Sequence, residues 1–131
     1  MQKIEHIGIA VRDIEKAKEL FSNLLNVKPY KEEIVEREGV ITAFFQIGEV
    51  KIELLQATRA DSAIATYIEK RGEGIHHIAF DVENIANEMD RLKKAGFQLL
   101  SEEPKKGADN KNIAFLHPKS TGGVLVELCQ D

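Results

Sequence analysis

Two histidines and two glutamates occupy matching positions in an internal repeat of the chain. The first copy opens with IEHIGIAVRDIE and closes with VKIELL, and the second opens with IHHIAFDVENIA and closes with VLVELC. His6 aligns with His77, and Glu53 aligns with Glu127. Imidazole nitrogens and carboxylate oxygens both bind divalent metals. Two copies of the pair therefore predict one four-ligand metal site, and with it a metal-centred enzyme that acts on a small molecule.

The predicted ligand set mixes nitrogen and oxygen donors. Co²⁺, Zn²⁺, Mn²⁺, Ni²⁺ and Fe²⁺ all accept such a set, so the ligand types leave the metal open. An octahedral ion held this way keeps room for water or substrate, unlike a closed structural zinc site. A lone histidine on an apolar strand is usually structural, and a lone glutamate at a strand end is usually solvated. The matched positions in both copies outweigh these ordinary explanations.

Strand alternation decides between the neighbouring histidines His76 and His77. Adjacent side chains on a strand point to opposite faces, so at most one of the two can face the site. The repeat aligns His77 with His6 and pairs His76 with Glu5. His77 is therefore the predicted ligand, and His76 is expected to be a satisfied polar residue under the sheet or at its edge. Cys129 shares the face of the last strand with the glutamate and is interpreted as a packing residue.

The hydrophobic periodicity of each copy predicts the order strand, helix, strand, strand, strand. Asp13 and Asn84 are the expected N-caps of the two helices. A connector that holds a short helix after Asp61-Ser62 separates the copies. The expected helices span residues 14–25 and 85–95, and the expected strands span residues 3–11, 27–36, 40–47, 50–56, 75–82, 97–101, 112–117 and 124–129.

These elements predict an α+β fold in a single domain of residues 1–131. Module one covers residues 1–56, a connector covers 57–73, and module two covers 74–131. A single βαβββ unit leaves one sheet face uncovered. Two paired units are therefore expected to form a curved, partly open eight-stranded sheet around a metal cleft.

Composition excludes several other classes. The net charge is −4, and the lysines and arginines are spread along the chain, unlike a nucleic-acid-binding face. The apolar runs are too short to span a bilayer. The N-terminal segment is patterned as a strand and not as a signal peptide, which predicts a cytoplasmic protein. Cys129 is the single cysteine and cannot form an internal disulfide. Apolar surface on two small modules predicts a homodimer.

On these motifs, the whole chain resembles the vicinal oxygen chelate superfamily, which includes glyoxalase I, extradiol dioxygenases and antibiotic-resistance proteins. Within that group, three segments are similar to the methylmalonyl-CoA epimerase family: GIHHIAFDVENI, LLSEEPKKGADNKNIAFLHP and NIAFLHPKSTGGVLVELCQ. The resemblance implies an isomerase that interconverts (2R)- and (2S)-methylmalonyl-CoA. It would remove the proton at C2 and stabilise the enolate with one divalent metal ion: Co, Zn, Mn or Ni.

The resemblance also assigns roles to residues. It implies that His6, Glu53, His77 and Glu127 are the metal ligands; the second of these is glutamine in some members. Glu127 is the predicted catalytic base on one face of the substrate, and Glu53 is the weaker candidate for the other face. One departure stands out, because some epimerases carry a glutamate base where this chain has Thr42. Either a different group serves as that base, or the strand alignment is off by some residues.

Three further alternatives remain open at the level of sequence. A glyoxalase I-like lactoylglutathione lyase uses related proton transfer and the same ligand types. A metal-free resistance protein that binds small molecules would not need the four ligands, and an extradiol dioxygenase would use an iron site. Gln46 could bind substrate but is a poor base. The phosphates of a CoA thioester substrate would favour the lysines of module two: Lys105, Lys106, Lys111 and Lys119.

Overall fold

The computed structural model describes residues 1–131, which divide into two compact units. Unit 1 consists of Met1–His6 and His77–Asp131, and unit 2 consists of Ile7–His76. Two strands, β1 (Lys3–Ala10) and β5 (Gly74–Asp81), contribute residues to both units. None of the helices is long and apolar enough to cross a membrane.

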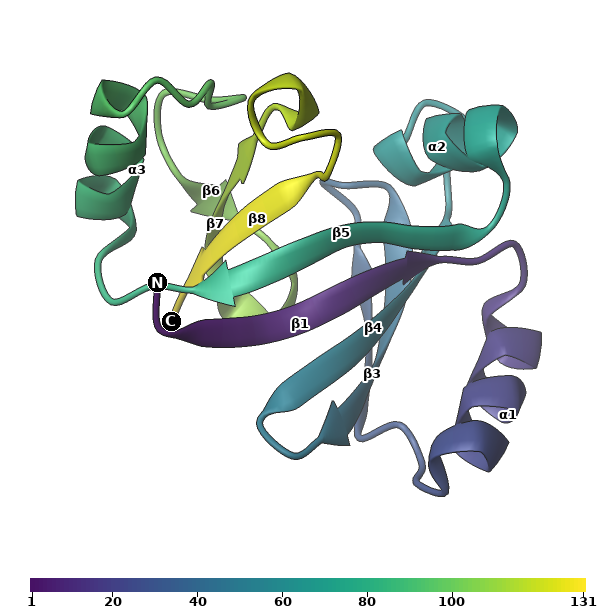
Figure 1. The fold of residues 1–131 in the computed structure, drawn as a ribbon. Helices are drawn as coiled ribbons and strands as arrows, with labels where there is room; N and C mark the ends of the chain where they lie inside the picture. Colours follow the sequence, from purple (N-terminus) through teal and green to yellow (C-terminus); the bar gives the residue numbers. More distant parts are fainter. The chain divides into compact units, whose positions relative to one another are not determined.

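In unit 1, one helix covers one face of a small sheet (Figure 1). Strand β5 pairs in parallel with β8 (Val126–Gln130). Both β8 and β6 (Lys105–Lys106) pair antiparallel with β7 (Asn112–Leu116). The apolar side of the helix packs on β7 and β8 through a core cluster that includes Met89, Leu116 and Leu128. Besides parts of β1 and β5, the elements are α3 (Ile85–Lys94), β6 (Lys105–Lys106), β7 (Asn112–Leu116), β8 (Val126–Gln130) and 3-10 turns at Ala108–Asn110 and Pro118–Ser120.

Unit 2 repeats this arrangement with a longer meander of antiparallel strands. Its first helix packs on a core cluster of the sheet that includes Ala43, Phe45 and Leu54. Because side chains alternate along a strand, Thr42 and Glu53 lie on the opposite face. The elements are α1 (Ile14–Leu25), β2 (Lys31–Val35), β3 (Val40–Ile47), β4 (Val50–Ala57) and α2 (Ala63–Arg71).

The helices begin where their capping residues predict. The Asp13 carboxylate accepts from the backbone N–H groups of Glu15 and Lys16, and the Asn84 side chain accepts from the N–H of Asn87. Ser62 caps the connector helix. The α+β class and the two βαβββ modules predicted from the sequence are confirmed, and seven of the eight predicted strands are present.

One predicted strand, residues 97–101, is wrong. This segment makes only an isolated bridge between Leu99 and Leu116, and the short strand β6 follows it at residues 105–106. The apolar side chains of Phe97 and Leu99 pack against the cluster beneath α3, which explains the strand-like pattern. The backbone of Gln98 bonds instead to the turn after β7, where its carbonyl accepts from the N–H of His117 at 2.7 Å.

Candidate metal centre

Three of the four predicted ligands come together in unit 1. His6 lies on β1, His77 on β5 and Glu127 on β8, and one ligand atom from each lies within 4.8 Å of the other two. The three residues are only 5 %, 3 % and 5 % exposed, respectively. Three neighbouring strands therefore place two imidazoles and a carboxylate together in the protein interior.

The spacing of these donor atoms fits a single metal ion. The two Nε2 atoms of His6 and His77 are 3.0 Å apart. The Oε1 atom of Glu127 is 3.1 Å from Nε2 of His77 and 3.7 Å from Nε2 of His6. Donors that each lie about 2.1 Å from one ion are separated by about 3.0–3.4 Å in octahedral or tetrahedral geometry. The triangle of donors is thus close to what one divalent ion requires.

Three further side chains contact the predicted ligands. The Nδ1 atom of His6 lies 3.0 Å from Oε1 of Glu5, and the thiol of Cys129 donates to Oε2 of Glu127 at 2.9 Å. Both residues are buried. The ring of Phe115 packs edge-on against His77, with 5.9 Å between the ring centroids. Every ligand of the triangle is therefore restrained by a neighbour.

The electrostatics of the centre favour an ionised Glu127. Burial by itself raises the pKa of this carboxyl group. The charge of His77 and the hydrogen bonds from His6 and His77 outweigh burial, so the pKa lies well below its ordinary value. A carboxylate that stays ionised is a competent metal ligand over the whole physiological pH range.

The fourth predicted ligand, Glu53, belongs to unit 2. It is 3 % exposed and stands opposite Phe44 in the register of β4 with β3. The group of three in unit 1 does not include it. Its role as a ligand therefore stays a prediction.

The place where some epimerases carry a glutamate base is also in unit 2. Thr42 is fully buried, and its hydroxyl group donates to the carbonyl of Glu33. Glu33 stands directly opposite Thr42 in the register of β2 with β3, so the two share a sheet face. Gln46 is exposed and donates to the carbonyl of Gly48 in the adjoining turn.

The remaining sequence candidates are dispersed. The ring of His76 packs edge-on against Tyr67, with centroids 5.0 Å apart, outside the group of three ligands. Lys105 and Lys106 form the exposed strand β6, and Lys119 lies in the 3-10 turn before β8. Lys111 pairs with Asp131 at the end of the chain.

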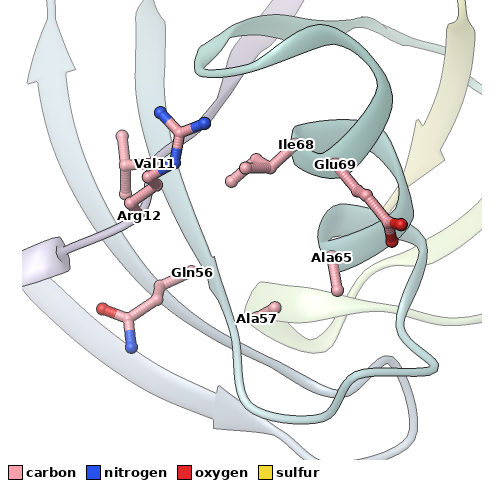
Figure 2. A pocket seen from close by; sticks show the side chains of 7 residues that line it. All are labelled: Val11, Arg12, Gln56, Ala57, Ala65, Ile68 and Glu69. Carbon is pink, nitrogen blue, oxygen red and sulfur yellow. The ribbon is translucent and has the colours of Figure 1, made fainter.

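A separate cavity of about 390 Å³ lies in unit 2 (Figure 2). Arg12 and Glu69 contribute its charged groups, and Gln56 is occupied by a hydrogen bond from the N–H of Ile14. The cavity has no histidine, so it lacks the imidazole donors that the candidate centre of unit 1 brings together. Its lining residues are Val11, Arg12, Gln56, Ala57, Ala65, Ile68 and Glu69.

The sequence reasoning missed the contacts behind the ligands. Glu5 was recognised only as the counterpart of His76, and Cys129 only as packing. One signal was available for each residue: both are polar and lie within two positions of a predicted ligand. Each also differs in type from its counterpart in the other copy of the repeat.

Comparison with known proteins decides the family. The family model of the Glyoxalase/Bleomycin resistance protein/Dioxygenase superfamily matches residues 5–115. The chain belongs to this superfamily. The resemblance predicted from the two His-Glu motifs is thereby confirmed.

Relatives within the superfamily include several epimerases. The chain is 42 % identical over 130 residues to an ethylmalonyl-CoA/methylmalonyl-CoA epimerase of Cereibacter sphaeroides, covering 98 % of this chain and 97 % of the relative. It is 42 % identical over 129 residues to the human mitochondrial methylmalonyl-CoA epimerase, covering 98 % of this chain and 73 % of the relative. A solved methylmalonyl-CoA epimerase in complex with methylmalonyl-CoA and NH4+ superposes with a TM-score of 0.96 at 34 % identity, over 100 % of this chain and 95 % of that one. The predicted similarity to methylmalonyl-CoA epimerases is confirmed.

Proposed function

We propose that this chain is a metal-dependent epimerase that interconverts (2R)- and (2S)-methylmalonyl-CoA. The observation that carries the proposal is the buried triangle of His6, His77 and Glu127, whose donor spacing fits one divalent ion. The epimerases described above supply the substrate class, since one is bound to methylmalonyl-CoA and another is named for both ethylmalonyl-CoA and methylmalonyl-CoA.

The chemistry of the substrate explains the need for such a centre. The C2 proton of methylmalonyl-CoA lies between a thioester and a carboxylate, and its removal places charge on the adjacent oxygens. A divalent ion held by His6, His77 and Glu127, with Glu53 as the proposed fourth ligand, would supply the Lewis acid that stabilises this enolate. The buried position of the three unit 1 side chains excludes water and strengthens every electrostatic interaction there.

Inversion at C2 requires proton transfer on both faces of the planar enolate. Glu127 is the proposed base on one face, and Glu53 is the weaker candidate for the other. The lowered pKa of Glu127 keeps it ionised but also makes it a weak base. Glu127 would therefore have to loosen from His77 and from the ion before it takes the proton.

Glu33 adds a carboxylate to the candidates for the second base. It is half-buried and shares the sheet face of Thr42, directly across from it. The carboxylate also lies 3.4 Å from the ammonium group of Lys31. Retention of the full exchange rate in Glu33→Gln would remove it from consideration and leave Glu53.

Substrate binding beyond the acyl group is proposed on charge alone. The phosphates of CoA would interact with four lysines of the second module: Lys105, Lys106, Lys111 and Lys119. Of these, Lys111 pairs with Asp131. The metal identity, the homodimer and the cytoplasmic location stay predictions.

A stereochemical assay tests the proposed function. Purified protein is incubated in D₂O with (2R)- or (2S)-methylmalonyl-CoA, and deuterium at C2 is followed together with the appearance of the other epimer. The proposal predicts both signals. Conversion of the methylglyoxal–glutathione hemithioacetal, with none of the CoA thioester, would instead establish a glyoxalase I-like lyase.

A further inference from the structure

We propose that Glu5 and Cys129 are positioning residues that hold His6 and Glu127 with their ligand atoms turned toward the metal. The inference rests on the metal centre of the proposed function and concerns the layer of side chains behind it. Neither residue is one of the predicted ligands.

Glu5 sets the proton position on His6. Its carboxylate is 5 % exposed, and Oε1 lies 3.0 Å from Nδ1 of His6. A buried carboxylate is costly unless it accepts hydrogen bonds, and Nδ1–H of the imidazole supplies one. When the imidazole is neutral and keeps its proton on Nδ1, the lone pair is on Nε2, the atom that lies 3.0 Å from Nε2 of His77. This is the tautomer that a metal ligand through Nε2 requires.

Cys129 fixes the carboxylate of Glu127 in the same way. The thiol is fully buried and donates to Oε2 at 2.9 Å. The other oxygen, Oε1, is left to face Nε2 of His77 at 3.1 Å. A carboxylate held by one oxygen offers the second as a single, oriented donor. Cys129 thus favours binding of Glu127 through one oxygen only.

The two positioning residues belong to one layer. A ligand atom of Glu5, one of His6 and the sulfur of Cys129 all lie within 4.8 Å of one another. Glu5 and Cys129 contact the atoms of His6 and Glu127 that do not belong to the donor triangle, Nδ1 and Oε2 respectively. Loss of Glu5 would let the ring of His6 rotate, and loss of Cys129 would let the carboxylate of Glu127 rotate. Neither loss would remove a donor from the ion.

The internal repeat indicates that the thiol of Cys129 is not required by the fold. The position of Cys129 corresponds to Leu55 in the first copy, and both carbonyls accept a 2.9 Å bond, from Val82 and Val11 respectively. The same backbone position therefore accommodates an apolar side chain. The counterpart of Glu5 is His76, another departure from symmetry.

The first arm of the test compares Cys129→Ala with Cys129→Ser. Affinity for Co²⁺ is measured by calorimetry on the metal-free proteins, and the absorption spectrum is recorded on the loaded ones. The alanine variant, which lacks a donor, is expected to bind about 10- to 100-fold more weakly. The serine variant keeps a donor and is expected to stay close to wild type. Equal affinities in both variants and wild type would overturn the role, as would a thiolate-to-cobalt charge-transfer band in wild type, which would make Cys129 a ligand.

The second arm compares Glu5→Ala with Glu5→Gln. The amide oxygen of glutamine still accepts from Nδ1–H, so its affinity for Co²⁺ is expected to lie between those of the wild type and the alanine variant. The alanine variant is expected to lose about 10- to 100-fold. Glu102→Ala, at an exposed position of the loop before β6, is the matched control and should leave affinity unchanged. Circular dichroism of every metal-free variant separates unfolding from lost positioning.

The outcomes for the two proposals differ. A wild-type protein that binds no divalent ion would overturn the metal centre, and the positioning role with it. Tight binding by wild type with unchanged affinity in the folded Cys129→Ala and Glu5→Ala variants would overturn the positioning role alone.

Discussion

The two copies of the repeat share a hydrogen bond that joins the last strand to the start of the helix. The side-chain oxygen of Gln56 accepts from the N–H of Ile14 at 2.7 Å, and that of Gln130 accepts from the N–H of Ile85 at 2.6 Å. In each copy the last strand thereby holds the first residue of the helix. Backbone and capping positions of the sequence repeat are thus also repeated in three dimensions.

The copies differ in the side chains around the ligands. Behind His6 stands Glu5, whereas its counterpart His76 packs on Tyr67. Beside Glu127 stands Cys129, whereas the side chain of its counterpart Leu55 has no group that can form a hydrogen bond. The comparison teaches that the symmetric residues build the scaffold and include the predicted ligands, whereas the asymmetric Glu5 and Cys129 contact those ligands in unit 1.

The largest expected effect is the loss of metal on replacement of His77. His77→Ala removes a corner of the donor triangle and is expected to abolish stoichiometric metal retention, measured by elemental analysis after gel filtration. His76→Ala, one residue away and outside the triangle, is the control and should retain the metal. Retained metal in the first variant would refute the ligand assignment.

Replacement of Glu53 and Glu127 tests whether the two copies contribute equally to proton exchange at C2. Glu127→Gln is expected to reduce deuterium exchange at C2 by about 100-fold or more, because an amide cannot accept the proton. Glu53→Gln should retain metal, since the resemblance allows glutamine there, and its exchange should fall less. Full exchange in the Glu127 variant would exclude this residue as a base.

The pH dependence of metal affinity distinguishes the imidazoles from the carboxylate. Each histidine binds either a proton or the ion, so affinity is expected to fall about tenfold or more between about pH 7.5 and about pH 5.5. Glu127 contributes little to this fall, because its lowered pKa keeps it ionised throughout the range. Calorimetry at a series of pH values checks this. A Glu127→Gln variant whose affinity no longer depends on pH would contradict it.

The smallest effect concerns the hydrogen bond that both copies form between the last strand and the helix. Gln56→Ala and Gln130→Ala each remove one hydrogen bond to a helix N-terminus and should lower the free energy of unfolding by about 1 kcal/mol. Denaturant titration of the metal-free proteins measures the loss. Similar losses of stability are expected for the two variants. A large loss in only one of them would show that the hydrogen bond contributes unequally in the two copies.

Periodicity and capping chemistry predicted the elements well, because they depend on local sequence. The choice of His77 over His76 also followed from alternation, and the structure places only His77 in the triangle. The contact between Glu5 and His6 escaped that rule, since neighbouring side chains leave a strand on opposite faces. Here, however, the side-chain atoms still come within 3.0 Å. Alternation fixes the direction of a Cβ atom and not the reach of a long side chain.

The failed strand at residues 97–101 has a similar origin. Phe97 and Leu99 flank the polar Gln98 as in a strand, but their apolar contacts are with the cluster beneath α3. Their backbone forms one bridge and turn contacts in place of a ladder. Period-two patterning reports which side is buried, and tertiary partners decide whether a strand pairs.

Metal titration of the exchange reaction tests the central claim most directly. Chelator-stripped protein in D₂O with methylmalonyl-CoA receives increasing Co²⁺, and deuterium at C2 is measured at each addition. We predict no exchange in the stripped protein and a linear rise that ends at one equivalent of metal per chain. Full exchange by the stripped protein, or none at any metal concentration, would contradict a metal-dependent epimerase.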